Sequence, residues 1–541
     1  MILTNKGLSE QTEWNKHNIK IFNFDRTTVT NQTKQSPNWI HFGAGNIFRA
    51  FPAAVCQKLI ENDDMQTGII VTEGFDYEIL DKINTPHDNL SLLVTLKANG
   101  TTEKTVIGSI VESLKLNSEL NDFSRLKEIF ASPSLQMASF TITEKGYKLT
   151  DASGNNFPDV ENDFKNGPSN PISYIGKVAA LCYHRFVSGK MPIAMVSMDN
   201  CSHNGTMLLD AVKAFALAWI QNGFVENGFM DYISNPEKVS FPWSMIDKIT
   251  PRPDPSVQST LENDGLENAA PIVTSKNTFV SIFVNAEETE YLVIEDAFPN
   301  GRPPLEKGGI LFTQRETVDK VEKMKVCTCL NPLHTALSIF GCILGHTKIS
   351  DEMKDLPLLS LVKRIGYIEG LPVVVDPEIL SPKEFLDTVI NVRLPNPFMP
   401  DTPQRIATDT SQKLSIRFGE TIKAYKNKGL DIEKLQGISL TLAGWCRYLM
   451  GIDDDGNQFE LSSDPMLNEM VPLLSGIQLG ECDVQKIHKV LSPILSNTVI
   501  FGVNLYDVGM GNMIEQNFVR LIKEPGAVRG TLIHYMELWQ K

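Results

Sequence analysis

The chain has few of the features that mark a disulfide scaffold or a metal protein. Eight cysteines are spread over 541 residues, and no two of them form a CxxC pair. The nearest two, Cys327 and Cys329, are separated by one residue in an apolar segment. Paired cysteines at fixed spacings are typical of disulfide frameworks and of structural zinc sites. We therefore expect a cytoplasmic protein in a reducing compartment, without a bound metal.

Long apolar runs and basic runs are equally scarce. A membrane-spanning helix needs roughly 18 or more consecutive apolar residues, whereas the longest apolar run, at residues 336–344, is interrupted by Ser338 and Gly341. The polar N-terminus lacks the apolar core of a signal peptide. The formal net charge is −15, and no long basic stretch occurs. Because anionic partners attract basic surfaces, we expect neither nucleic acid nor a membrane as a partner.

The first half of the chain alternates between strand and helix patterns. An apolar strand at residues 39–42 leads through Gly43-Ala44-Gly45 into a helical pattern, and the next apolar run, at residues 68–74, ends in an acid. Further strands are predicted at residues 92–96, 105–109, 137–143 and 193–198, with helices at 123–130 and 175–186. Such alternation predicts an α/β fold, a Rossmann-like domain with a mostly parallel sheet.

The second half is mainly helical. Helical patterns are found at residues 331–344, 360–368, 383–389, 408–424, 438–450, 483–494 and 512–536. The proline- and glycine-rich stretch at residues 298–304 suits a domain junction, because neither helix nor sheet tolerates that density of both residues. We therefore predict a Rossmann-like domain at residues 1–300 and a mainly α-helical domain at residues 301–541.

The glycine turn after the first strand indicates a dinucleotide site. Gly43 and Gly45 permit a tight turn and close approach of a pyrophosphate, which Asn46 and Ile47 at the start of the helix would also contact. The third glycine of the usual pattern is replaced by Phe48. Without its context, the same turn would be an ordinary loop.

Glu73 ends the strand that follows the glycine turn. Its carboxylate is placed to bond both ribose hydroxyls and to repel a 2′-phosphate, which favours NAD over NADP as the cofactor. Its separation from the glycines is longer than the usual roughly 20 residues. The alternative is a solvated glutamate at the end of a strand.

Four further segments, in this order, resemble one family. They are TITEKGY at residues 141–147, DNCSHNG at 199–205, FPWSMIDKITP at 241–251 and LNPLHTAL at 330–337. With the glycine turn, they resemble the polyol-specific long-chain dehydrogenases, the mannitol dehydrogenase family, over roughly residues 39–425. A fifth segment, RIATDTSQKL at residues 405–414, resembles the fructuronate reductase (D-mannonate oxidoreductase) branch more than the mannitol branch.

The resemblance implies a metal-independent enzyme whose active site lies between a Rossmann-like and a helical domain. It implies that Thr143 and Glu144 lie beside the cofactor and that a lysine shortly before the Asn-x-x-His motif is the base. Lys325 is that lysine, with Lys323 as the fallback and a surface lysine as the alternative. Lys325 lies six positions before Asn331 instead of the five expected, so either one residue bulges out or the lysine is aimed differently.

The resemblance also assigns the polar groups around the substrate. Asn200 and Asn331 would donate to the reacting oxygen, although Asn200 also suits a plain turn. His334, one helical turn beyond Asn331, would donate to a substrate hydroxyl or orient Lys325, unless it is a core histidine. Asp247 would accept hydrogen bonds from the polyol, or it forms an ion pair with Lys248 or an arginine. We expect Lys325, Asn200 and Asn331 to meet beside the nicotinamide.

Two cations point to an anionic substrate. Arg405 and Lys413 are eight residues apart, about two turns along one face if the segment is helical. Two cations on one face suit a carboxylate, although they are also ordinary on a helix surface. An acidic protein that handles a sugar acid needs such local positive charge, because its net field repels the substrate.

We therefore predict an NAD-dependent oxidoreductase that interconverts D-fructuronate and D-mannonate through a lysine acid/base. The alternatives within enzymes are a mannitol (polyol) 2-dehydrogenase and a tagaturonate reductase. The non-enzyme alternative is a nucleotide-binding sensor that has lost catalysis, which only the shifted spacing before Asn331 favours. The expected partner is a small sugar acid or polyol, and the expected assembly is a monomer or small homo-oligomer.

Overall fold

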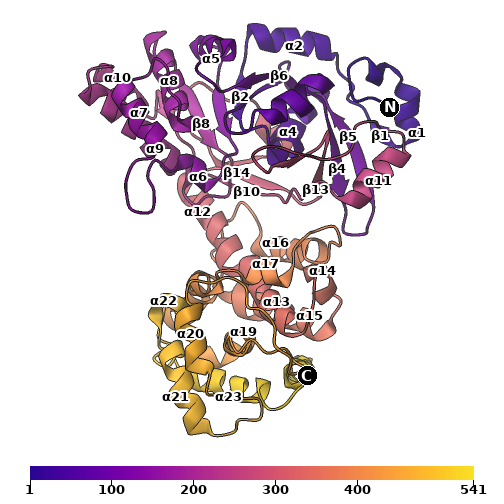
Figure 1. Ribbon diagram of the computed structural model, residues 1–541, viewed down its shortest axis with the longest axis vertical. Coiled ribbons are helices and arrows are strands. Elements are labelled where there is room, and N and C mark those ends of the chain that lie inside the picture. Colours follow the sequence, from indigo (N-terminus) through magenta and orange to yellow (C-terminus); the bar gives the residue numbers. More distant parts are fainter. Residues whose placement is uncertain (541) are drawn as a thin grey trace. The chain divides into compact units, whose positions relative to one another are not determined.

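A computed structural model describes residues 1–540 (Figure 1). The chain divides into two compact units, one of residues 1–97 and 101–319, and one that begins at Lys320 and includes the short segment 98–100. The stretch at residues 298–304, where we expected a junction, belongs to the first unit. There Asn300 donates from Nδ2 to the carbonyl of Leu135 at 2.7 Å, which attaches this stretch to the strand region of the first unit.

A six-stranded parallel sheet forms the centre of the first unit, as predicted. Its strands are β2 (Trp39–Phe42), β3 (Ile69–Glu73), β6 (Ile110–Lys115), β7 (Met137–Phe140), β8 (Ile193–Ser197) and β9 (Val239–Ser240). The strand order is β6-β3-β2-β7-β8-β9, and every neighbouring pair is parallel. The chain therefore starts in the middle of the sheet and winds outward in both directions, which is the doubly wound arrangement.

The central strands are mostly apolar because both faces of the sheet are covered. Every residue of β2, β3, β7 and β8 is buried. Ile40 and Phe42 pack with helices α5 (Asn121–Ala131) and α8 (Tyr174–Val187) in one hydrophobic core (Figure 1). Parallel strands covered on both faces appear in sequence as continuous apolar runs. For this reason the runs at residues 39–42 and 68–74 were recognisable as strands.

Two predicted strands belong to a different sheet. β4 (Ser91–Leu96) and β5 (Thr102–Ile107) pair antiparallel, because a short connection joins them, and they lie in a four-stranded sheet with β1 (Ile19–Lys20) and β13 (Phe283–Glu287). A third sheet contains β10 (Ser244–Asp247), β14 (Tyr291–Glu295) and β15 (Leu311–Thr313), and a hairpin pairs β11 (Ile272–Val273) with β12 (Phe279–Val280).

The N-terminal segment packs against the segment around residue 265. The amino group of Met1 donates to the carbonyl of Gly265, and the amide of Glu267 donates to the carbonyl of Met1 at 2.9 Å. His17 lies 3.1 Å from Asp264, atom Nδ1 to Oδ1. Two segments for which the sequence indicated no role therefore bind each other at the edge of the first unit.

The second unit is helical. Its longer helices are α13 (Asn331–Ile343), α15 (Leu356–Lys363), α18 (Glu420–Asn427), α19 (Gln436–Tyr448), α21 (Val484–Leu495), α23 (Gly511–Leu521) and α24 (Ala527–Trp539). A Cβ atom at Gly444 of α19 would lie 2.6 Å from the ring of Phe340 on α13, so glycine allows these core helices to approach closely. The helical run from Arg315 to Ile343 is long and apolar enough to cross a membrane, but 78% of its apolar window is buried inside the protein.

Two long helices predicted in this unit are wrong. The region at residues 408–424 contains a left-handed Asp409 (φ 53°), a 3₁₀ turn and a π-helix, Ser415–Gly419, before α18 begins. The region at residues 512–536 is two helices, because Pro525 lacks an N–H group and Gly526 adopts φ 81°. Apolar periodicity continues across both breaks and hides them in the sequence.

A carboxyl group is buried without a partner in the second unit. Glu352, at the end of α14 (Ile349–Glu352), is 0% exposed, and neither of its oxygens has a hydrogen-bond partner among the described residues. Burial, followed by the charge of Asp355, raises the pKa of Glu352 to about 9. Between its ordinary pKa and this value, the folded protein therefore holds a proton that the unfolded chain has released.

Glu352→Gln should therefore stabilise the protein increasingly as the pH rises. Relative to the wild type, its free energy of unfolding should gain about 1.4 kcal/mol per pH unit between pH 5 and pH 8. Urea denaturation at several pH values measures this difference. Glu537→Gln, at an exposed glutamate of α24, is the control, and its free energy of unfolding should change with pH as that of the wild type does. If the free energy of unfolding of Glu352→Gln had the same pH dependence as that of the wild type, the Glu352 carboxyl would be ionised in the folded protein.

Candidate active site

Gly43 lies where the central sheet reverses its strand order. Its φ is 111°, and a Cβ atom there would lie 2.8 Å from the carbonyl oxygen of Thr141, which follows β7. Its amide donates to the carbonyl of Thr72 in β3 at 2.8 Å. The turn after β2 thus touches the carboxyl ends of both neighbouring strands, and only glycine fits. Ligands of doubly wound sheets bind at this point.

The space around Gly45 is open, whereas that around Gly43 is filled by the backbone of Thr141. Its φ is an ordinary −71°, and nothing lies within 4 Å of a Cβ atom built there. It caps the short helix α3 (Asn46–Ala50), so the open space lies beside the amides of the first helical turn. Such space suits the close approach of a pyrophosphate. Phe48, in place of the third glycine, is buried and stacks on His41 of β2 with ring centroids 4.3 Å apart.

The carboxylate of Glu73 accepts hydrogen bonds from the glycine turn and from the loop that follows β3. It ends β3 as predicted and is 6% exposed. Oε2 accepts from the amide of Ala44 at 2.8 Å, while Oε1 accepts from the amides of Phe75 at 2.8 Å and Asp76 at 3.1 Å. The carboxylate therefore holds the glycine turn against the loop that follows β3. Contact with a ribose stays a prediction.

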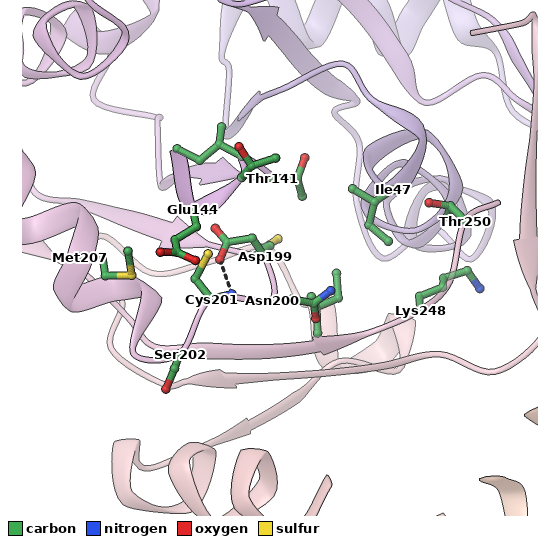
Figure 2. Close-up of a pocket in the computed structure, with 14 residues that line it drawn as sticks. Ile47, Thr141, Glu144, Asp199, Asn200, Cys201, Ser202, Met207, Lys248 and Thr250 are labelled. Carbon is green, nitrogen blue, oxygen red and sulfur yellow. Dashed lines mark hydrogen bonds between the residues drawn. The ribbon is translucent and has the colours of Figure 1, made fainter. Parts of the chain in front are cut away.

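A cleft of about 630 Å³ opens at the carboxyl ends of β7 and β8 (Figure 2). Four predicted site residues line it: Ile47 from α3, Thr143 and Glu144 after β7, and Asn200 after β8. The remaining lining residues are Thr141, Ile142, Met198, Asp199, Cys201, Ser202, Met207, Ile246, Lys248 and Thr250. Segments that resemble the family and lie far apart in the sequence therefore share one wall of the first unit.

A buried polar network holds the turn that carries Asn200. The hydroxyl of Tyr147, in α6 (Glu144–Tyr147), donates to the carboxylate of Asp199, and its oxygen lies 2.9 Å from Ser197 Oγ. Asp199 Oδ1 accepts from the amide of Cys201 at 2.9 Å. Burial raises the pKa of Asp199, and burial with the Asp199 charge raises that of Tyr147. We had assigned no role to Tyr147 or Asp199, although both lie in the segments that carry the resemblance.

Asn204 completes this network. It is 0% exposed, its Nδ2 donates to the carbonyl of Asp199 at 3.3 Å, and its Oδ1 accepts from the amide of Ser244 at 3.1 Å. His203, with φ 52°, stacks on Trp243 at a centroid distance of 4.1 Å. Both side chains therefore act as scaffolding that joins the loop after β8 to β10.

Asp247 is not among the lining residues of this cleft. It is buried at the end of β10, while Ile246 and Lys248 on either side of it line the cleft. Since successive side chains of a strand point to opposite faces, Asp247 points to the other face. Lys248 donates to Glu290 Oε2 at 2.7 Å and to the carbonyl of Glu287 at 3.0 Å. A polyol contact of Asp247 stays a prediction.

In the helical unit, a π-helix explains the spacing between Lys325 and Asn331. The π-helix Lys325–Cys329 joins α12 (Arg315–Met324) to α13, which begins at Asn331. A π-turn contains one more residue than an α-turn requires, and such turns are frequent at functional sites. The additional residue between Lys325 and Asn331 is therefore accommodated within the helix. This is the bulge that the sequence analysis gives as one of two alternatives.

His334 lies on α13 one turn after Asn331, as expected. Its Nε2 is 3.4 Å from Asp401 Oδ2. Burial, and then the positive charges of Arg417, Arg393, Arg405 and Lys413, lower the pKa of His334 to about 3. The imidazole is therefore neutral at physiological pH, with one N–H group to donate and one nitrogen to accept.

The expected shared helix face of Arg405 and Lys413 is wrong. Arg405 is in α17 (Pro403–Ala407) and pairs with the Asp401 carboxylate one turn before it. Lys413 follows the left-handed Asp409 and donates to the carbonyl of Thr408. Both charges nevertheless act on His334. The two cations therefore act on one histidine although they do not share a helix face.

The two glycines of the turn provide a matched pair of variants. Gly45→Ala should leave the thermal midpoint within a few degrees of the wild type but weaken NADH binding at least about tenfold, since the methyl group enters the open space. Gly43→Ala should lower the midpoint markedly, because it strains φ and collides with Thr141. Scanning calorimetry and NADH fluorescence titration measure both. Unchanged NADH affinity in a folded Gly45→Ala protein would exclude this turn as the pyrophosphate site.

Known proteins match this chain over nearly its whole length. Family models of the mannitol dehydrogenase Rossmann domain and C-terminal domain match residues 37–307 and 317–521. The D-mannonate oxidoreductase of Thermotoga maritima is 53% identical over 535 residues, 98% of each chain. The same fold is seen in a D-sorbitol dehydrogenase (TM-score 0.79, 24% identity, covering 98% of this chain and 100% of that one) and in a Pseudomonas fluorescens mannitol 2-dehydrogenase solved with NAD and D-mannitol (TM-score 0.67, 24% identity, 99% and 100%). The chain therefore belongs to the mannitol dehydrogenase family.

Proposed function

We propose that this protein is an NAD-dependent oxidoreductase that interconverts D-mannonate and D-fructuronate. The 53% identity to a D-mannonate oxidoreductase over 98% of both chains supports this substrate. The structural observation that carries the proposal is the group of four cationic side chains, Arg393, Arg405, Lys413 and Arg417, whose charges act on His334. A neutral polyol has no charge to pair with these cations, whereas the carboxylate of a sugar acid pairs with them. We place the enzyme in the cytoplasm, as a monomer or small homo-oligomer.

The residues of the first unit suit a dinucleotide. Gly43, Gly45, Asn46 and Ile47 would hold the pyrophosphate, Glu73 the ribose, and Thr143 and Glu144 the nicotinamide end. A mannitol 2-dehydrogenase with this fold was solved with NAD. When bound, the nicotinamide supplies the acceptor for the hydride that leaves the alcohol carbon. A carboxylate at Glu73 disfavours the additional phosphate of NADP.

Proton transfer is assigned to Lys325. In the oxidation of D-mannonate, its neutral amine takes the proton of the reacting hydroxyl, and in the reverse direction its ammonium group returns that proton to the oxygen. The amides of Asn200 and Asn331 donate to this oxygen in both directions, because an amide does not titrate. Donors directed at a developing alkoxide stabilise it most when water is excluded.

The remaining predicted residues are assigned to substrate orientation. Arg405 and Lys413 would bind the carboxylate, Asp247 would accept from the polyol hydroxyls, and neutral His334 would donate to one of them. The side chains of Asn331 and His334 stand one turn apart on α13, which gives them a fixed separation.

Three other functions are less well supported. A mannitol 2-dehydrogenase would fit the family, but its neutral substrate would not pair with the cationic group. The substrate of a tagaturonate reductase is also a sugar acid, so that function is placed second only because of the 53% identity to a D-mannonate oxidoreductase. A sensor without catalysis was favoured only by the shifted lysine spacing, which the π-helix Lys325–Cys329 accounts for.

The substrate proposal is tested by assaying the purified protein with NADH and D-fructuronate, D-tagaturonate or D-fructose. D-fructuronate should have the highest kcat/KM, by at least about a hundredfold over D-fructose, because only the sugar acids can pair with the cations. NADPH should be the poorer cofactor. Faster reduction of D-fructose than of either uronate would contradict the substrate assignment, and faster reduction of D-tagaturonate would favour the other uronate.

The assignment of the base is tested by Lys325→Ala. Its kcat should fall by roughly 10²- to 10⁴-fold, the usual contribution of general acid–base catalysis, while NADH binding is unchanged. Lys323→Ala, two residues earlier in the helical segment, is the matched control and should keep near wild-type turnover. If the two variants exchanged these outcomes, Lys323 would be the base.

A further inference from the structure

Arg417 is a half-buried cation without an acidic partner among the described residues. It lies in the π-helix Ser415–Gly419, and its Nη1 donates to Thr335 Oγ1 at 2.5 Å. Throughout residues 1–540, no carboxylate lies within ion-pairing distance of its guanidinium. Burial lowers its pKa to about 10, so the group is still charged at neutral pH.

A fully buried arginine of the first unit illustrates a guanidinium whose N–H donors are all hydrogen-bonded. Arg185 in the first unit donates to five backbone carbonyls, those of Phe130, Ser132, Leu135, Met191 and Pro192. Arg417, in contrast, has one described hydrogen-bond partner, the hydroxyl of Thr335. A ligand that covers this half-buried guanidinium must pair with its remaining N–H donors, because burial of an unpaired charge is costly. An anion meets this requirement.

The surroundings of Arg417 place that anion. The π-helix Ser415–Gly419 packs against the π-helix that begins with Lys325, and both pack against α13. Thr335, which accepts from Arg417, itself donates to the carbonyl of Asn331 at 2.9 Å. Of the cations near His334, Arg405 is paired with Asp401 and Lys413 with a backbone carbonyl. Arg417, by contrast, has neither a carboxylate nor a backbone carbonyl as a described partner, and it contacts α13 directly through Thr335.

We propose that Arg417 makes the bidentate contact with the substrate carboxylate, to which Arg405 and Lys413 contribute as neighbouring cations, and that this contact selects sugar acids over neutral polyols. The inference rests on the proposed function. A guanidinium presents paired donors that match a carboxylate in a bidentate arrangement. A bound neutral polyol would cover this half-buried charge without pairing with it, so the enzyme would discriminate against it through the energetic cost of that unpaired group.

The experiment compares Arg417→Gln and Arg417→Lys with the wild type in the oxidation of D-mannonate. KM should rise roughly 10- to 150-fold in Arg417→Gln, the range for a hydrogen bond to a charged group, with kcat within about threefold. Arg417→Lys, which keeps the charge, should recover part of the loss. Arg520→Gln, at an exposed arginine in the last turn of α23, is the control and should behave as the wild type.

A second variant separates binding from positioning. Thr335→Val removes the hydroxyl between Arg417 and Asn331 and keeps the volume of the side chain. It should change KM for D-mannonate by less than about threefold. If it reproduced the loss seen in Arg417→Gln, or if Arg417→Gln lowered kcat with KM unchanged, Arg417 would act through Asn331 and the proposal would be overturned.

Direct binding distinguishes this inference from the proposed function. With the NADH complex, calorimetry should show that Arg417→Gln loses affinity for D-mannonate by the same factor as KM rises, but not for D-mannitol. Equal losses for both ligands would overturn the role of Arg417 even if the enzyme oxidises D-mannonate. A wild-type protein that binds D-mannonate through Arg417 but does not oxidise it with NAD would instead overturn the proposed function alone.

Discussion

The close approach of the backbone at Gly43 to the carbonyl of Thr141 is the constraint on which the first unit depends. It is possible only because Gly43 lacks a Cβ atom and adopts φ 111°. The Glu73 carboxylate then fastens the next amide, that of Ala44, to the end of β3. Three parallel strands are thereby joined at one edge, and the cleft with Asn200 opens beside that edge.

The helical unit is organised by an excess of positive charge around a neutral histidine. Four cationic side chains act on His334, and the Asp401 carboxylate pairs with Arg405. The resulting positive potential suits an anionic substrate, in a chain whose net charge of −15 would otherwise repel it. Burial is the first cause of the neutral state of His334, and the cations that add to it would also attract a sugar acid.

The local positions of some candidate site residues were predictable because these residues lie in short segments with local rules. The glycine turn follows a buried strand, and the spacing of Asn331 and His334 is one helical turn. Arg417, Tyr147 and Asp199 were missed, because a lone arginine, tyrosine or aspartate in sequence carries no sign of its partners. The Arg405–Lys413 interpretation was wrong in its geometry, because the left-handed Asp409 interrupts the helix between them.

By itself, the amino-acid sequence determined the alternation of strands and helices, the parallel sheet, the glycine turn and the family, since these depend on local periodicity and on short motifs. Only the tertiary structure decided that β4 and β5 leave the central sheet, that Glu73 bonds the Ala44 amide and that a π-helix takes up the extra residue after Lys325. It also decided which buried charges have partners. Pairing and burial depend on contacts between residues far apart along the chain, and no local pattern encodes them.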